Sequence, residues 1–154
     1  MKSRMITLPE AIADIVKACE VCTVGMVDSE NRPYTLPFNF GFEKQTVYLH
    51  SAPVGRKIEV MRANPEVCIV FSTAHELYKQ SENVACSYGM RYKSVLVRGK
   101  VEFITDFDEK VRILNIIMKQ YTKRDDFEYS TPSVNGVAVM KIVAEKIEAK
   151  AFGY

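Results

Sequence analysis

The sequence contains little that points to a membrane, an export route or a nucleic acid. Its apolar runs are all far shorter than the ~20 residues that a membrane-spanning helix needs. The first ten residues, MKSRMITLPE, include two basic residues but no apolar segment, so we expect no signal peptide. The net charge is only +2 and the basic residues are dispersed, which does not favour a nucleic-acid-binding stripe.

Motifs for nicotinamide cofactors and metals are also missing. No GxGxxG motif is present, so we expect no dedicated nicotinamide-binding domain. The four cysteines, without an export signal, favour reduced thiols and a cytoplasmic location. Cys19 and Cys22 form a CxxC pair, but no second pair or histidine pair completes a metal site. The pair also follows the C-terminal end of an expected helix, where a thiolate is not stabilised. We therefore interpret both cysteines as core residues and expect no metal.

What is present indicates a single domain over residues 1–154, because the length fits one core and 47% of the residues are apolar. Hydrophobic periodicity predicts helices over 8–19, with Thr7 and Glu10 as a capping box, and over 107–121, capped by Asp106. Strand-like runs occur at 21–27, 32–42, 47–49, 67–72, 84–104 and 137–147. Residues 73–82 and 122–135 are expected to be loops. Strands that mostly follow one another favour a small antiparallel barrel with peripheral helices over an α/β sheet.

Two strand-like runs carry further expectations. Pro33 and Pro37 cannot donate ladder hydrogen bonds, so the run 32–42 should be irregular or lie at a sheet edge. In the run 84–104, Gly99 suggests a bulge or bend. The basic residues around it are interpreted as one solvated strand face: Arg91, Lys93, Arg98 and Lys100.

The stretch 48–67, YLHSAPVGRKIEVMRANPEV, is the most informative part of the chain. A short strand ends at His50 and Ser51, and Arg56 and Lys57 follow Gly55 at the start of a second expected helix, which stops at Asn64-Pro65. The first N–H groups of a helix have no intrahelical partner, and the helix dipole favours negative charge there. Two adjacent cations at such a position would oppose the dipole unless an anion compensates. We therefore predict a phosphate-binding site.

Several segments together resemble a known family. PYTLPFNFGF, VYLHSAPVGRK, NPEV and CSYGMRYKSVLVRGKVEF occur in the order found in FMN-binding split barrels of the pyridoxamine 5′-phosphate oxidase superfamily. Within that group, the chain most resembles the 5-nitroimidazole-resistance branch. The C-terminal arginine and histidine motif that binds substrate in the pyridoxamine-phosphate oxidases has no counterpart in EAKAFGY, which argues against the vitamin B6 reaction.

The resemblance implies a mainly β (α+β) fold, a six-stranded antiparallel split barrel, and a homodimer that holds FMN in two clefts at the interface. The phosphate would be bound by Ser51, Arg56 and Lys57. The strand backbone from Leu36 through Pro37 and Phe38 to Asn39 would run along the flavin ring. The resemblance places His50 close to the flavin as the candidate catalytic residue, and it gives Tyr92 and Ser94 to the lining of the same site.

These observations favour an FMN-dependent oxidoreductase, in which NAD(P)H or another reductant would reduce the flavin and a small acceptor would reoxidise it. A nitroaromatic, a quinone or a free flavin would be a suitable acceptor. A non-catalytic protein that stores, senses or delivers flavin or haem is an alternative, with His50 as a haem ligand. A deazaflavin-binding protein is another, because both flavin types carry a phosphate.

Overall fold

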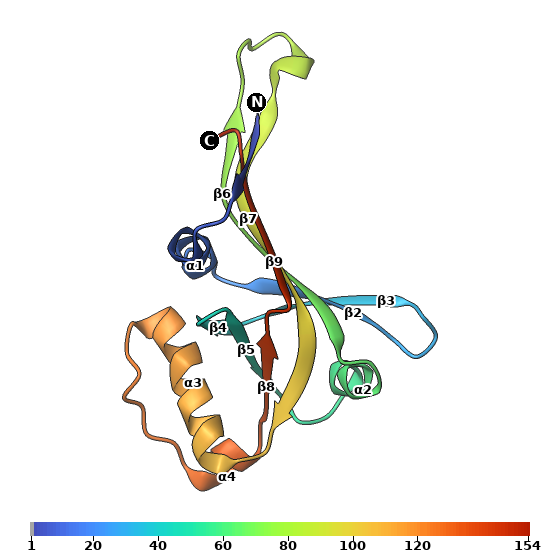
Figure 1. The fold of residues 1–154 in the computed structure, drawn as a ribbon, viewed down its shortest axis with the longest axis vertical. Coiled ribbons are helices and arrows are strands. Elements are labelled where there is room, and N and C mark those ends of the chain that lie inside the picture. The colour runs from blue at the N-terminus through green and yellow to red at the C-terminus, as the bar shows by residue number, and fades with distance from the viewer. Residues whose placement is uncertain (1) are drawn as a thin grey trace.

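The computed structural model describes residues 2–154, which form an antiparallel β structure with four α-helices (Figure 1). The helices are α1 (Pro9–Lys17), α2 (Arg56–Ala63), α3 (Phe107–Thr122) and α4 (Thr131–Asn135). The strands are β1 (Ser3–Ile6), β2 (Cys22–Val27), β3 (Pro33–Phe38), β4 (Phe40–Glu43), β5 (Thr46–Ser51), β6 (Glu66–Tyr78), β7 (Gly89–Ile104), β8 (Ala138–Val143) and β9 (Lys146–Phe152). A short 3₁₀ turn covers Ala85–Ser87.

The sheet has the topology of a split barrel, with nine strands in place of the expected six. Its main path runs β3-β2-β6-β7-β8-β5-β4, and β9 branches from β7 and carries β1. The two ends of the path, β3 and β4, are consecutive in the chain and are joined only by Asn39, so the chain itself links the two ends of the path. Counting this bent pair as one strand recovers the six expected strands, and β9 and β1 are additional.

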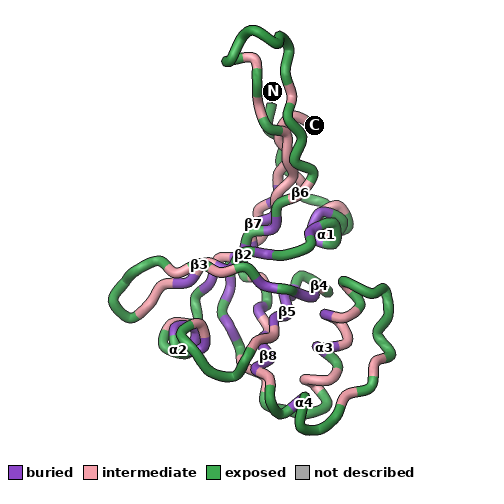
Figure 2. Tube along the Cα trace, turned by 180° about the vertical axis from the view of Figure 1, so that it is seen from behind, coloured by how far each residue is buried: buried purple, intermediate pink, exposed green. Residues whose placement is uncertain are grey.

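Two hydrophobic clusters hold the molecule together. The first fills the barrel, where the rings of Phe40 and Phe71 meet edge to face at 4.8 Å between centroids. The second lies between α3 and the outer face of β5 and β8, around Ile113, Ile117 and Val139. Figure 2 shows the buried segments in these two places, while the hairpin that extends from the body is mostly exposed.

Gly99 marks the point where β7 changes partner. The strand pairs with β9 as far as Arg98 and with β8 from Val101 onward. A Cβ on Gly99 would lie 2.5 Å from the carbonyl oxygen of Val143, so only glycine allows this close approach. The expected bulge is absent from the β6–β7 pairing here, since Gly99 stays in register with Val67.

The predicted loop at 73–82 is wrong for residues 73–78. They continue β6 past a register shift between Thr73 and Glu76 and pair with the start of β7. Together these segments form the arm, residues 73–93, which projects from the body in Figure 1. Because most of the arm is exposed on both faces, its sequence lacks the alternation of apolar and polar residues that identifies a strand.

Other boundaries also differ from the sequence-based expectations. The first helix begins at Pro9 with Leu8 as its N-cap, so the Thr7 capping box is not formed. Proline is favoured at the first helical position, and Thr7 lies one residue too early to cap. The expected strand 137–147 is two strands, β8 and the start of β9, and the expected loop 122–135 contains α4.

The Asp106 cap is confirmed: its carboxylate accepts from the Glu109 amide at 2.9 Å. The edge position of the proline-containing run is confirmed as well, because β3 ends the sheet path.

Candidate functional site

The N-terminus of α2 presents free backbone donors. Gly55 precedes the helix with φ 112°, a conformation that residues with a Cβ rarely adopt. The carbonyl of Gly55 accepts from the amides of Ile58 and Glu59 at 3.0 and 3.2 Å. Within residues 2–154, no acceptor meets the amides of Arg56 and Lys57. This turn therefore has the open N–H groups that an anion site requires.

The two cations at this helix start lie against aromatic rings of β3. The Arg56 guanidinium is 4.4 Å from the centroid of Tyr34, and the Lys57 ammonium is 5.7 Å from that of Phe38. Arg56 also lies 3.5 Å from the Asp28 carboxylate, at the turn between β2 and β3. Lys57 has no carboxylate partner in the described part of the chain. The strand thus positions two cationic side chains beside the open amides of α2.

His50 and Ser51 end β5, directly before the turn into α2. Burial lowers the pKa of His50 below its ordinary value of 6.5, so the imidazole is neutral at pH 7. Its Nδ1 atom is buried and has no hydrogen-bond partner among residues 2–154. Such an atom is costly to leave unpaired, so it is a natural contact for a bound molecule. The Ser51 hydroxyl donates to the Ala52 carbonyl at 2.8 Å and keeps its acceptor lone pairs.

The β3 segment can contact a ligand mainly through its backbone groups and less through its side chains. Leu36 and Phe38 pack toward the barrel core, while Pro37 and Asn39 are exposed. In the described chain β3 pairs only with β2, so its other edge has unpaired backbone groups. An edge of this kind can lie beside a flat ligand and hydrogen-bond to its rim. Behind it, Tyr121 of α3 accepts from the Phe40 amide at 3.1 Å, which fixes the bend at Asn39.

Tyr92 and Ser94 lie elsewhere in the chain. They are on the outer face of β7, where the Tyr92 ring rests 5.6 Å from that of Phe152. Both line a cavity of about 530 Å³ together with Val70 of β6 and Lys150 of β9. In Figure 1 this end of β7 leads into the arm, whereas α2 lies beside the opposite end of the barrel. One chain therefore brings together His50, Ser51, Arg56, Lys57 and β3, but not Tyr92 and Ser94.

Several residues around these two places could not be expected from the sequence motifs alone. Tyr34 and Asp28 contact Arg56, and Lys150 lies 5.4 Å from the Tyr92 ring. The alternation of β3 could have indicated Tyr34, which shares its face with Phe38. Nothing in the sequence pairs Lys150 with Tyr92, because that contact depends on the register of β9 against β7.

The cysteine pair has no part in this site. Cys19 and Cys22 are buried in the barrel cluster, as the sequence indicated, and form no disulfide within residues 2–154. Burial raises the pKa of both thiols, that of Cys22 to about 12, which disfavours the reactive thiolate.

Among residues 2–154, no group of three or more His, Cys, Asp and Glu side chains is placed to hold a metal. No helix in the same range is long and apolar enough to cross a bilayer.

A comparison with known protein families shows to which family this chain is related. Residues 9–151 match the pyridoxamine 5′-phosphate oxidase family. The chain belongs to this family. No curated protein matches its sequence significantly.

Solved structures agree with the family assignment. A candidate 5-nitroimidazole antibiotic resistance protein from Bacteroides thetaiotaomicron is 45% identical, with a TM-score of 0.86 over 98% of this chain and 88% of that one. A flavocytochrome from Azotobacter vinelandii is 19% identical, with a TM-score of 0.81 over 99% and 70% of the two chains. An FAD- and haem-binding protein from Mycobacterium smegmatis is 15% identical, with a TM-score of 0.83 over 97% and 74%. The last two likenesses show a shared fold.

Proposed function

We propose that the protein is an FMN-dependent oxidoreductase that works as a homodimer in the cytoplasm and reduces a small acceptor. The observation that carries this proposal is the start of α2, where open amides lie beside Arg56 and Lys57. The same turn follows His50 and Ser51, and all four residues lie in the segment that resembles the flavin-binding split barrels.

The residues at this place fit a flavin phosphate and ring. The phosphate would meet the α2 amides, with Lys57 as a point charge and Arg56 as a planar fork. Arg56 would have to weaken its 3.5 Å contact with Asp28, and Ser51 would rotate its hydroxyl from the Ala52 carbonyl. The ring system would lie along the free backbone edge of β3, from Leu36 to Asn39.

When bound, the flavin would supply hydride and electron transfer between a reductant such as NAD(P)H and the acceptor. The chain's own contribution is to hold, orient and shield. His50, neutral and with a buried free Nδ1, can accept or donate one hydrogen bond at the ring or the acceptor. It is therefore the residue of this chain best placed to relay a proton to a reduced acceptor.

A homodimer would complete the site. Tyr92 and Ser94 line a cavity on the arm side of the barrel, away from α2 of the same chain. We propose that these residues reach the flavin held by α2 of a second copy. The outer face around this cavity carries exposed apolar side chains, including Met5 and Val70, which a second copy would cover.

The visible absorption spectrum of the purified protein, before and after addition of FMN, tests this function directly. We expect a flavin spectrum with quenched fluorescence, and we expect NADH or NADPH to bleach it under anaerobic conditions. Addition of a nitroaromatic or a quinone should then restore the oxidised spectrum. A protein that remains colourless with FMN would contradict the cofactor assignment, and bound flavin that no reductant bleaches would contradict turnover.

A non-catalytic flavin- or haem-binding protein is a second candidate. It is favoured by the Nδ1 of His50, unpaired within residues 2–154, together with two structural neighbours, one named as a flavocytochrome and the other as an FAD- and haem-binding protein. An intense haem band that disappears in His50→Ala would support it and would replace the oxidoreductase proposal. Mass spectrometry of the released ligand separates FMN from FAD and from a deazaflavin.

A further inference from the structure

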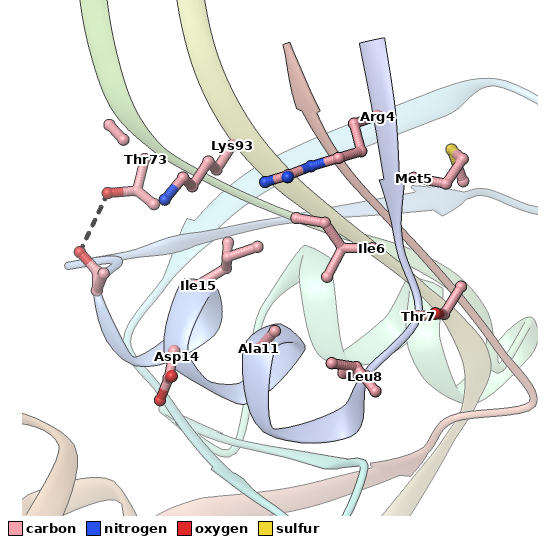
Figure 3. Close-up of a pocket in the computed structure, with 12 residues that line it drawn as sticks. Arg4, Met5, Ile6, Thr7, Leu8, Ala11, Asp14, Ile15, Thr73 and Lys93 are labelled. Carbon is pink, nitrogen blue, oxygen red and sulfur yellow. Dashed lines mark hydrogen bonds between the residues drawn. The ribbon is translucent and has the colours of Figure 1, made fainter. Parts of the chain in front are cut away.

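A second cavity lies between α1 and the sheet, close to where the arm begins (Figure 3). Its volume is about 530 Å³, within the roughly 300–1,000 Å³ of small-molecule sites. Its lining comes from four elements: Arg4, Met5 and Ile6 of β1, Ala11, Asp14 and Ile15 of α1, Thr73 of β6 and Lys93 of β7. Met5 also lines the cavity of Tyr92 and Ser94, but the other residues take no part in the flavin site proposed above.

Sheet register brings two cations to this cavity. Arg4 pairs with Ala151, Ala151 pairs with Lys93, and Lys93 pairs with Thr73. The four residues therefore form one row across β1, β9, β7 and β6, with their side chains on the same face. Ala151, fully buried, lies between the cations and is too small to fill the space. With strands about 4.8 Å apart, the two cationic residues stand about 10 Å apart at their Cα atoms.

Neither cation, Arg4 or Lys93, forms an ion pair within the described part of the chain. The Lys93 ammonium lies 5.2 Å from the Tyr154 ring, a contact that leaves its charge in place. Among the described residues of the lining, Asp14 is the only carboxylate, and in Figure 3 it points away from both cations. Like charges on one sheet row repel each other, so a bound anion would stabilise this arrangement.

The floor of the cavity is apolar. Ile6 lines it and belongs to the next row of the sheet, whose other members, Ala149, Val95 and Phe71, are buried in the core behind the cavity. On the opposite side, α1 contributes Ala11 and Ile15, as Figure 3 shows. The cavity thus combines two cations at one side with an aliphatic surface beneath them.

We propose that this cavity binds an amphiphilic organic anion, a carboxylate attached to an aromatic or aliphatic body, between Arg4 and Lys93. A guanidinium matches the two oxygens of a carboxylate with parallel hydrogen bonds, and an ammonium adds a point charge. The apolar body rests on Ile6, Ile15 and Ala11. The site is separate from the flavin site, so this proposal stands whether or not the protein binds FMN.

The probe for the test is 2-naphthoate, with neutral 2-naphthamide as the matched compound. The full chain is titrated as purified, and amide chemical shifts are followed by NMR. We expect saturable shifts at Ala11, Ala18 and Thr73, with a Kd of about 1 mM or tighter for a ligand of this size. The amide should bind at least about fivefold more weakly, because the charge-assisted contact with the two cations is lost.

Three variants, one of them a control, test whether the anion binds between Arg4 and Lys93. Lys93→Met keeps the aliphatic stem and removes the charge, and it should weaken 2-naphthoate about tenfold. Lys100→Met, on the same strand but paired with Glu66 outside the cavity, is the control and should change the Kd less than about twofold. Arg4→Gln, at an exposed position, gives a second measurement if Lys93→Met does not fold.

Three results would overturn the proposal. The first is the absence of shifts up to about ten times the expected Kd. The second is equal affinity for the acid and the amide. The third is unchanged binding in both Lys93→Met and Arg4→Gln, or shifts confined to α2.

Discussion

Each of the two proposed anion sites contains a pair of cationic residues. Only the first pair, Arg56 and Lys57, can be recognised from the sequence; the second pair is Arg4 and Lys93. Arg56 and Lys57 are neighbours in the chain, and they follow a glycine at the start of a helix. Arg4 and Lys93 are far apart in the chain and meet only through the register of β1, β9 and β7. The comparison teaches that an anion site made by a helix terminus is a local property, whereas one made by a sheet row is a property of the fold.

The two pairs also differ in their surroundings. Arg56 and Lys57 lie over aromatic rings of β3, next to free helix amides. Arg4 and Lys93 line a cavity with an aliphatic floor and no helix amides aimed at the ligand. The first arrangement suits a phosphate, and the second suits an organic acid with an apolar body.

Removing one charge from the first pair should give the largest effect. In Lys57→Met the flavin phosphate loses a charge-assisted contact, so we expect FMN affinity to fall by about 10- to 100-fold. Fluorescence titration with FMN measures this loss, and 2-naphthoate binding should stay the same. Lys93→Met is the matched variant and should show the opposite pattern. If Lys57→Met retained flavin at wild-type affinity, the phosphate would have to bind elsewhere.

Filling the second cavity should have the next largest effect. Ala11→Leu places a larger side chain in the lining, and leucine is a good helix former, so the helix itself should tolerate it. We expect 2-naphthoate binding to weaken by at least about tenfold, while the free energy of unfolding changes by less than about 1 kcal/mol.

Ala13→Leu is the control for that change, because Ala13 lies on α1 but faces a different cavity, beside α3. It should leave 2-naphthoate binding unaffected. Equal weakening in both variants would mean that the effect comes from the helix as a whole and not from the cavity.

The contrast between local features and features that depend on the fold also explains which parts of the structure could be predicted from the sequence. The long β7 strand, the α3 helix with its Asp106 cap and the turn at Gly55 all follow from local pattern, and all are present. The β6 half of the arm, residues 73–78, was missed because exposed strands lack alternation, and β1 because its four residues carry no clear period.

The interpretation of four basic residues as one strand face failed for a related reason. On β7, Arg91 and Lys93 have the opposite parity to Arg98 and Lys100, so they lie on the other face of the strand. Lys93 then becomes half-buried beneath α1, a position that depends on where the helix packs. Periodicity gives the face of a strand, but it does not say what covers that face.

The backbone of Gly55, directly before Arg56 and Lys57, gives a prediction with a smaller expected effect. Gly55 has φ 112°, and a Cβ added there would meet no atom within 4 Å, so any cost of Gly55→Ala comes from backbone strain alone. We expect the free energy of unfolding to fall by about 1–2 kcal/mol, measured by urea denaturation, and FMN binding to weaken as the α2 amides shift. Val54→Ala, at the exposed preceding residue, is the control. Unchanged stability in Gly55→Ala would show that the turn relaxes to a conformation open to any residue.

The smallest expected effect concerns pH, and it arises from His50 beside the first pair. Burial lowers the pKa of this imidazole in the folded protein below the ordinary value of 6.5 that it has when unfolded. The unfolded chain therefore takes up a proton first as the pH falls, so the stability contributed by neutral His50 is present above pH 6.5 and is lost below it.

Urea denaturation of the flavin-free protein between about pH 7.5 and about pH 5.5 measures this loss, and the decline should be smaller in His50→Gln. His75→Gln removes the exposed histidine on the arm and should retain the wild-type decline. If His50→Gln declined as steeply as the wild type, His50 would not be the group that responds. A bound flavin that hydrogen-bonds to Nδ1 should shift this pH dependence, whereas 2-naphthoate at the second pair should leave it unchanged.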